Sequence, residues 1–146
     1  MSYLVRTIGL VVLAVATVSQ AGDWPSFRGP HGNGITEEKV APLEWSQAKN
    51  IKWKVALPKP SNGSPIVSHG RVFLTCADSK GEKRSLYAFD RKTGEQVWVR
   101  TVEFSAVEPT HKTNPYCAST PAADGRCVVV WHGSAGLYCY DFDGKE

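Results

Sequence analysis

The stretch Ala88-Phe89-Asp90-Arg91-Lys92-Thr93-Gly94-Glu95-Gln96-Val97-Trp98 decides the fold, because it joins a tight turn to the start of a strand. It fits the pattern A-x-D-x-x-T-G-x-x-x-W. Asp90 can accept hydrogen bonds from the backbone amides of the turn, and Gly94 supplies the positive φ that closes a hairpin. Trp98 opens the following strand, where its ring can lie against a neighbouring unit.

Parts of this stretch and of the segment before it recur along the chain. The segment Leu86-Tyr87-Ala88-Phe89-Asp90 returns as Leu137-Tyr138-Cys139-Tyr140-Asp141, at an offset of 51. Pro65-Ile66-Val67 with Gly70-Arg71-Val72 returns as Pro121-Ala122-Ala123 with Gly125-Arg126-Cys127, and Trp53-Lys54-Val55 matches Trp98-Val99-Arg100. A repeat of about 50 residues with four short strands is typical of a propeller blade, and blades must stack to bury both faces of each sheet.

Short β-type runs separated by turn residues fill the same region. We expect strands at residues 51–57, 65–67, 72–76, 86–89, 96–102, 126–131 and 137–140. In the first of these, Ile51, Trp53, Val55 and Leu57 alternate with Lys52, Lys54 and Ala56, which is the pattern of a half-buried strand. The sequence therefore predicts an all-β protein whose residues 51–146 form about two β-propeller blades of four antiparallel strands, an incomplete propeller.

The eleven-residue pattern resembles the tryptophan-docking motif of the quinoprotein-like (PQQ-like) β-propeller repeat family. This family includes quinone-dependent alcohol dehydrogenases and the outer-membrane barrel-assembly propeller. The resemblance implies a structural docking role for Ala88, Asp90, Thr93, Gly94 and Trp98. In the second copy, residues 139–146 keep the Asp and the Gly with one residue fewer between them, and the docking Trp is expected just after Glu146. We therefore expect an N-terminal fragment of a bacterial exported repeat protein.

Residues 1–21 have the pattern of a secretory signal peptide. Arg6 forms a short basic region, residues 8–18 form an apolar run, and Ser19-Gln20-Ala21 place small residues before a cleavage site. A run of about 11 residues is too short to span about 30 Å of hydrocarbon, so we expect cleavage and no membrane span afterwards. No Cys lies near the cleavage site, so no lipid anchor is expected. The protein is then exported, to the periplasm or outside the cell.

Residues 22–50 form a lead-in segment before the first blade. Its glycine-rich beginning, residues 22–34, has neither the preceding strand nor the following helix of a phosphate-binding loop. We interpret it as an ordered turn region held by Trp24 and Phe27. The formal net charge of +3 and the absence of a basic block argue against nucleic acid as a partner.

The connection at residues 108–117 is the strongest candidate for function. It contains His111, Asn114 and Tyr116, and interblade loops gather at one end of a propeller channel, where ligands bind. These three residues are our candidate binding loop; the alternative is a solvated turn with Tyr116 packed on a blade. We expect no catalytic residue and no metal site in this chain, because His111, Cys117, His132 and Cys139 have no metal-binding spacing.

The four cysteines, Cys76, Cys117, Cys127 and Cys139, have no C-x-x-C spacing. An exported protein meets an oxidising compartment, so two disulfides in any of three pairings are one reading. Buried free thiols on strands are the other.

Two functions follow from the resemblance. The first is a binding or scaffolding module of the cell envelope, which contacts a protein partner or a small ligand at the propeller channel and needs no cofactor. The alternative is the N-terminal part of a dehydrogenase that holds pyrroloquinoline quinone (PQQ) with calcium. Quinone-holding members of the family typically carry an adjacent Cys-Cys pair and acidic and amide ligands for calcium; this sequence has no adjacent cysteines. The first function is therefore the preferred prediction.

Overall fold

The computed structural model describes residues 22–39, 41–106, 108–114 and 116–146, so the predicted signal peptide lies outside the described residues. The secondary structure consists of strands and one short 3₁₀ helix. This confirms the all-β prediction, and the two antiparallel sheets are consistent with incomplete propeller blades. No helix in the described ranges is long and apolar enough to cross a membrane.

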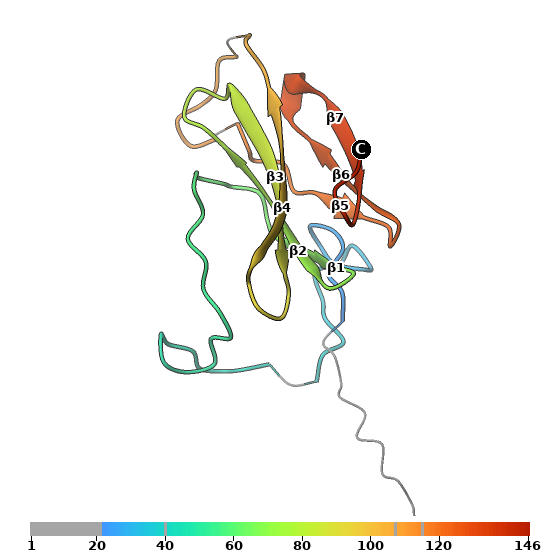
Figure 1. Cartoon of the computed structure of the whole chain (residues 1–146). Coiled ribbons are helices and arrows are strands. Elements are labelled where there is room, and N and C mark those ends of the chain that lie inside the picture. Colours follow the sequence, from blue (N-terminus) through green and yellow to red (C-terminus); the bar gives the residue numbers. More distant parts are fainter. Residues whose placement is uncertain (1–21, 40, 107, 115) are drawn as a thin grey trace, which may run out of the picture.

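The first sheet contains four antiparallel strands in the order β1-β2-β3-β4 (Figure 1). Their bounds are β1 (Ile66–Ser68), β2 (Arg71–Ala77), β3 (Lys83–Asp90) and β4 (Gln96–Glu103). The β1–β2 hairpin turns at His69 and Gly70, which have φ values of 52° and 72°. Two consecutive positive φ values match the right-handed twist of the strands, which is why this sequence reverses direction within two residues.

The second sheet repeats the first as far as its third strand. It has the order β5-β6-β7, with β5 (Ala122–Ala123), β6 (Cys127–Trp131) and β7 (Leu137–Asp141). The 3₁₀ helix η1 (Gly133–Ala135) occupies the glycine-rich turn between β6 and β7. The predicted strands in this region are therefore found within one or two residues of their expected ends.

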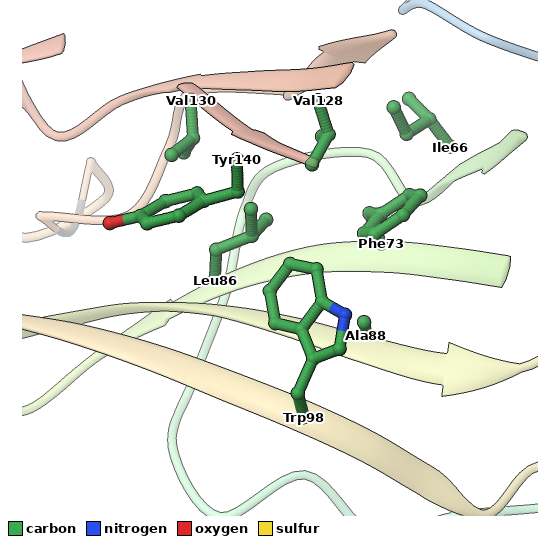
Figure 2. Close-up of a cluster of buried hydrophobic side chains, with 8 residues drawn as sticks. All are labelled: Ile66, Phe73, Leu86, Ala88, Trp98, Val128, Val130 and Tyr140. Atoms are coloured by element: carbon green, nitrogen blue, oxygen red, sulfur yellow. The ribbon is translucent and has the colours of Figure 1, made fainter. Parts of the chain in front are cut away.

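The hydrophobic core lies between the two sheets (Figure 2). Alternate side chains of a strand point to the same face, and the face of β3 that carries Leu86 and Ala88 meets the face of β6 that carries Val128 and Val130. The remaining members are Ile66, Phe73, Trp98 and Tyr140. The rings of Phe73 and Trp98 lie 5.7 Å apart with a tilt of 48°. One blade alone would expose this surface, so the sequence needs two stacked sheets to form a core.

Two equivalent turns receive the docking tryptophans. At the first turn, Asp90 Oδ1 accepts hydrogen bonds from the amides of Lys92 (2.8 Å) and Thr93 (3.0 Å), and Gly94 has a φ of 78°. Asp141 Oδ1 holds the second turn in the same way, through the amides of Asp143 and Lys145.

Trp98 of β4 connects the first sheet to the turn of the second. Its Nε1 donates to the carbonyl oxygen of Phe142 at 3.0 Å, and its ring lies where a Cβ on Gly144 would be 2.9 Å away. Trp53 makes the matching contacts one unit earlier, with Nε1 donating to the carbonyl oxygen of Arg91 at 3.0 Å and its ring over Gly94. Each docking tryptophan therefore contacts the turn of the unit that follows it.

The strand predicted at residues 51–57 is wrong for this structure. The segment is extended but belongs to no sheet, and none of the backbone hydrogen bonds between described residues involves it (Figure 1). Ile51, Val55 and Leu57 are exposed, whereas the Trp53 side chain docks against the turn of the first sheet at Arg91. The alternation of apolar and polar residues describes a strand only when a neighbouring strand satisfies the backbone, and here no neighbour is present.

The lead-in segment contacts both sheets near Trp24. The amide and carbonyl of Trp24 pair with those of Val67 in β1 at 2.7 and 2.9 Å, and the Pro25 carbonyl oxygen accepts from the Ala123 amide of β5 at 2.9 Å. Phe27, which we also expected to hold this segment, is 66% exposed and does not. Residues 26–34 form tight turns closed by their own backbone hydrogen bonds, so this part of the segment does not depend on the Phe27 ring.

Candidate functional site

A small hollow lies at the end of the sheets opposite the docking turns. It has a volume of about 190 Å³ and is bordered by the start of β3, the β4–β5 connection and the β6–β7 turn. The lining residues are Arg84, Glu108, Pro109, Thr110, Asn114, Tyr116, Ala118, Ser119, Trp131 and Gly133. The hollow therefore belongs to both blades and to the loop that joins them.

Arg84 holds these parts together. Its side chain is buried, and Nε donates to the Gly81 carbonyl oxygen at 3.0 Å while Nη1 donates to the His132 carbonyl oxygen at 2.5 Å. Nη2 forms an ion pair with Glu108. The guanidinium lies 4.8 Å from the ring centroid of Phe104 and 5.0 Å from that of Tyr116, a cation–π arrangement. Because every face of the guanidinium is engaged, Arg84 fixes the loop rather than remaining available as a binding group.

Glu108 is the acidic partner in this arrangement. Its carboxylate accepts hydrogen bonds from the Ser134 hydroxyl and from Arg84. The hydrogen bond from Ser134, followed by the one from Arg84, holds the pKa of the Glu108 carboxyl below its ordinary value. The carboxylate is consequently ionised at neutral pH and connects the β4–β5 connection to η1.

His132 is buried behind the hollow at the end of β6. Its ring lies 5.8 Å from the ring of Tyr138, and Nε2 has no hydrogen-bond partner among the described residues. Burial, together with the positive charge of Arg84, lowers the pKa of His132 from 6.5 to about 4. The imidazole is therefore neutral at physiological pH, because protonation would place a positive charge away from water and beside the Arg84 cation.

The structure brings two of the three predicted binding residues to the hollow. Asn114 lies exposed at its edge, and Tyr116 forms part of its wall, with the Tyr116 hydroxyl donating to the Glu108 carbonyl oxygen at 2.7 Å. His111 is exposed and does not line the hollow; its Nδ1 lies 2.7 Å from the Thr113 hydroxyl. The Tyr116 ring also covers Gly81, where a Cβ would lie 2.4 Å from the ring. Tyr116 thus packs on a blade and borders the hollow at once.

The donor groups at the hollow do not fit a calcium-bound quinone. Glu108 already binds Arg84 and Ser134, and the described part of the chain contains no cluster of three His, Cys, Asp or Glu side chains arranged for a metal ion.

The four cysteines are free thiols. Cys76 and Cys117 are buried, and burial is the main cause that raises the pKa of Cys76 to about 11. Cys127 and Cys139 lie on adjacent strands, where Cys139 pairs with Val129 two residues from Cys127. A hydrogen bond with Cys139 is the main cause that raises the pKa of Cys127 to about 11. The register therefore brings one cysteine pair together on the β6–β7 hairpin.

A second hollow, of about 780 Å³, lies within the lead-in segment, where all its lining residues fall between Gly22 and Lys39. Its His31–Glu37 ion pair (3.4 Å) has both side chains more than half exposed. Apart from Asp23 and Trp24, which contact the first sheet, the lining residues belong to one exposed loop, so the smaller site between the blades is the stronger candidate.

The stacked antiparallel sheets, the repeated turns and the docked tryptophans define a protein built from β-propeller blades. The family model described as outer membrane protein assembly factor BamB matches residues 43–115, which is half of the chain. The chain therefore belongs to this family of PQQ-like repeat proteins, as the docking motif predicted. None of the curated proteins compared with the chain matches it significantly.

Proposed function

We propose that this chain is a protein-binding module of the cell envelope that recognises its partner at the hollow between the two blades. The size of the hollow carries the proposal. At about 190 Å³ it is smaller than the roughly 300–1,000 Å³ typical of sites for cofactors and other small molecules. It is large enough to receive one side chain of a partner protein, and its edge offers both polar and aromatic groups.

The way in which the loop is held supports the same function. Arg84 ties Glu108 of the β4–β5 connection to Gly81 and to His132 at the end of β6, so the connection is anchored beside the hollow. A preordered loop loses less conformational entropy when it binds than a mobile one. The family description names an assembly factor for outer membrane proteins, which is a function exercised through protein contacts.

Site-specific photocrosslinking tests the proposal in the cell. A photoreactive phenylalanine analogue replaces Asn114 at the edge of the hollow, and a matched control places it at Lys145, which is exposed beside the docking turn at the other end of the blades. We expect one discrete adduct with an envelope protein from position 114 and none from position 145. Equal adducts from both positions, or none from 114, contradict the proposed site.

Export and cofactor binding are tested separately. We propose that the chain is exported, so the mature N-terminus, determined by protein sequencing of the envelope fraction, should lie near Gly22. Incubation with PQQ and calcium followed by dialysis should leave no stoichiometric quinone absorbance. A quinone band that persists after dialysis would contradict the proposed binding module and favour the dehydrogenase alternative.

A further inference from the structure

The first blade holds three consecutive residues of the lead-in segment. Arg91 Nη2 donates to the Gly22 carbonyl oxygen at 3.3 Å, and Asp23 Oδ2 accepts a hydrogen bond from the amide of His69 at 2.9 Å. The backbone of Trp24 pairs with that of β1, and Figure 1 shows this part of the segment beside that strand. The carbonyl side of Gly22 is therefore held in place, and the position of its nitrogen is fixed with it.

The Gly22 nitrogen faces a carboxylate. It donates to Glu38 Oε1 at 2.6 Å, and this oxygen, at 3.8 Å, is the one atom beyond the chain neighbours that a Cβ on Gly22 would meet within 4 Å. The amide of Glu38 donates to the Thr36 hydroxyl at 3.1 Å, which sets the start of the Glu38 side chain. Among the described residues, the Glu38 carboxylate has no other hydrogen bond or ion pair. The nitrogen thus has one acceptor and room for the additional hydrogens of an ammonium group.

This hydrogen bond joins the two ends of a loop. The turns at residues 26–34 are closed by their own backbone hydrogen bonds. Residues 35–39 are exposed, and within the described ranges the contact between Gly22 and Glu38 is the one hydrogen bond that connects them to residues 22–25. Both residues also line the larger hollow. The strength of their contact therefore decides how often the loop and this hollow open.

We propose that removal of the signal peptide locks this loop through an ion pair between the new α-ammonium group of Gly22 and the carboxylate of Glu38. The inference rests on the proposed export, which places the cleavage after Ala21. Hydrolysis of the Ala21–Gly22 bond by a signal peptidase consumes one water molecule and leaves a carboxylate on Ala21 and an amine on Gly22. An α-amine is mostly protonated at about pH 6.5. The neutral amide of the precursor is thereby replaced by a full positive charge opposite the carboxylate, which adds Coulomb attraction to the hydrogen bond.

The neighbouring acidic groups leave Glu38 as the partner of the new ammonium group. Asp23 forms an ion pair with Arg91 at 3.5 Å, and Glu37 forms one with His31 at 3.4 Å. Both of these carboxylates already have a partner of their own. Because exposed ion pairs contribute modestly, we expect the lock to slow opening of the loop about two- to fivefold, without a comparable effect on the blades.

Hydrogen exchange followed by mass spectrometry at about pH 6.5 tests the ion pair. The chain with Gly22 as its first residue is compared with the same chain preceded by two alanines, in which the Gly22 nitrogen is again an amide. In the peptide that covers residues 30–39, we expect amide exchange about two- to fivefold slower in the chain that begins at Gly22. The difference should disappear in Glu38→Gln and remain in the matched control Glu37→Gln, which removes a charge of the same sign one residue away.

The pairing and the cleavage are tested apart from each other. Both chains are released from a fusion protein by a protease, so the exchange experiment does not require export. Equal exchange in the two chains, or a difference that persists in Glu38→Gln, overturns the ion pair. A mature N-terminus other than Gly22 in the envelope fraction overturns the cleavage site, and with it the inference, whatever the exchange data show.

Discussion

Substitution of Gly94 by alanine should show how strongly the docked Trp53 stabilises the first blade. Gly94 has a φ of 78°, and a Cβ placed there would lie 2.6 Å from Trp53 Cδ2. Gly70 has a φ of 72°, with no atom within 4 Å of an added Cβ, so Gly70→Ala introduces the same backbone strain without the contact. The pair of variants therefore separates the cost of the backbone conformation from the cost of displacing the ring.

The magnitudes follow from these contacts. A side chain in the left-handed region costs about 1–2 kcal/mol, and this cost applies to both variants. Gly94→Ala must also displace the Trp53 ring, which loses the hydrogen bond from Nε1 to the Arg91 carbonyl oxygen and part of the ring's packing. The hydrogen bond contributes about 1 kcal/mol, and lost packing adds a similar amount. We expect Gly94→Ala to destabilise the protein by about 2 kcal/mol more than Gly70→Ala.

Urea unfolding followed by far-ultraviolet circular dichroism measures both free energies of unfolding, in the wild-type background and with Trp53→Ala. Once the ring is removed, the methyl group at position 94 has nothing to displace, so Gly94→Ala and Gly70→Ala should then cost the same. Equal costs in the wild-type background would show that docking contributes no stability. An excess cost at position 94 that persists without Trp53 would show that the strain has another source.

Three further outcomes follow from the site and the cysteines. Burial lowers the pKa of His132 to about 4, so as the pH falls the unfolded chain takes up a proton on this residue before the folded chain does. The free energy of unfolding should therefore fall by about 3 kcal/mol between pH 6.5 and pH 4. His132→Gln, compared by urea unfolding at both pH values, should lose that part of the pH dependence; an unchanged profile contradicts the assignment. Arg84→Met should cost about 3 kcal/mol, measured in the same way, because two buried carbonyl oxygens lose their donor; a cost below about 1 kcal/mol would mean that the loop does not depend on Arg84. Oxidation with diamide should join Cys127 to Cys139, found by peptide mapping; a Cys139 that remains free shows that the two thiols do not meet on the hairpin.

The elements predicted correctly from the sequence are those that local chemistry specifies. The turn from Asp90 to Gly94 needs an acceptor and a positive φ within five residues, and both are visible in the sequence. The hairpin at His69 and Gly70 is equally local. The repeat then extends these local predictions to the second sheet, which is why β6 and β7 were found close to their expected ends.

The errors concern features that depend on distant partners. The 51–57 segment has the alternation of a strand, but pairing requires a second edge, which no local pattern specifies. Arg84 was not singled out, because it lies before the strand expected at residues 86–89, where no local pattern distinguishes it from an exposed residue. Its burial depends on Glu108 and on the His132 carbonyl oxygen, which lie 24 and 48 residues away in the chain. The connection at residues 108–117 stays a predicted binding loop, and the contacts that hold it were not predicted, because they come from Arg84 in β3.

The two ends of the blades are stabilised in different ways, and this difference places the site. The end with the docking turns is built from residues that recur, since Asp90 and Gly94 have counterparts in Asp141 and Gly144. The residue that corresponds to Arg84 in the second copy is Ala135, so of the two blades that the structure describes only the first has the buried guanidinium. A feature needed by every blade would recur with the repeat, whereas Arg84 serves one connection between two particular blades. The non-repeated end is therefore where this propeller can differ from others of the same fold, and a partner that distinguishes them should bind there.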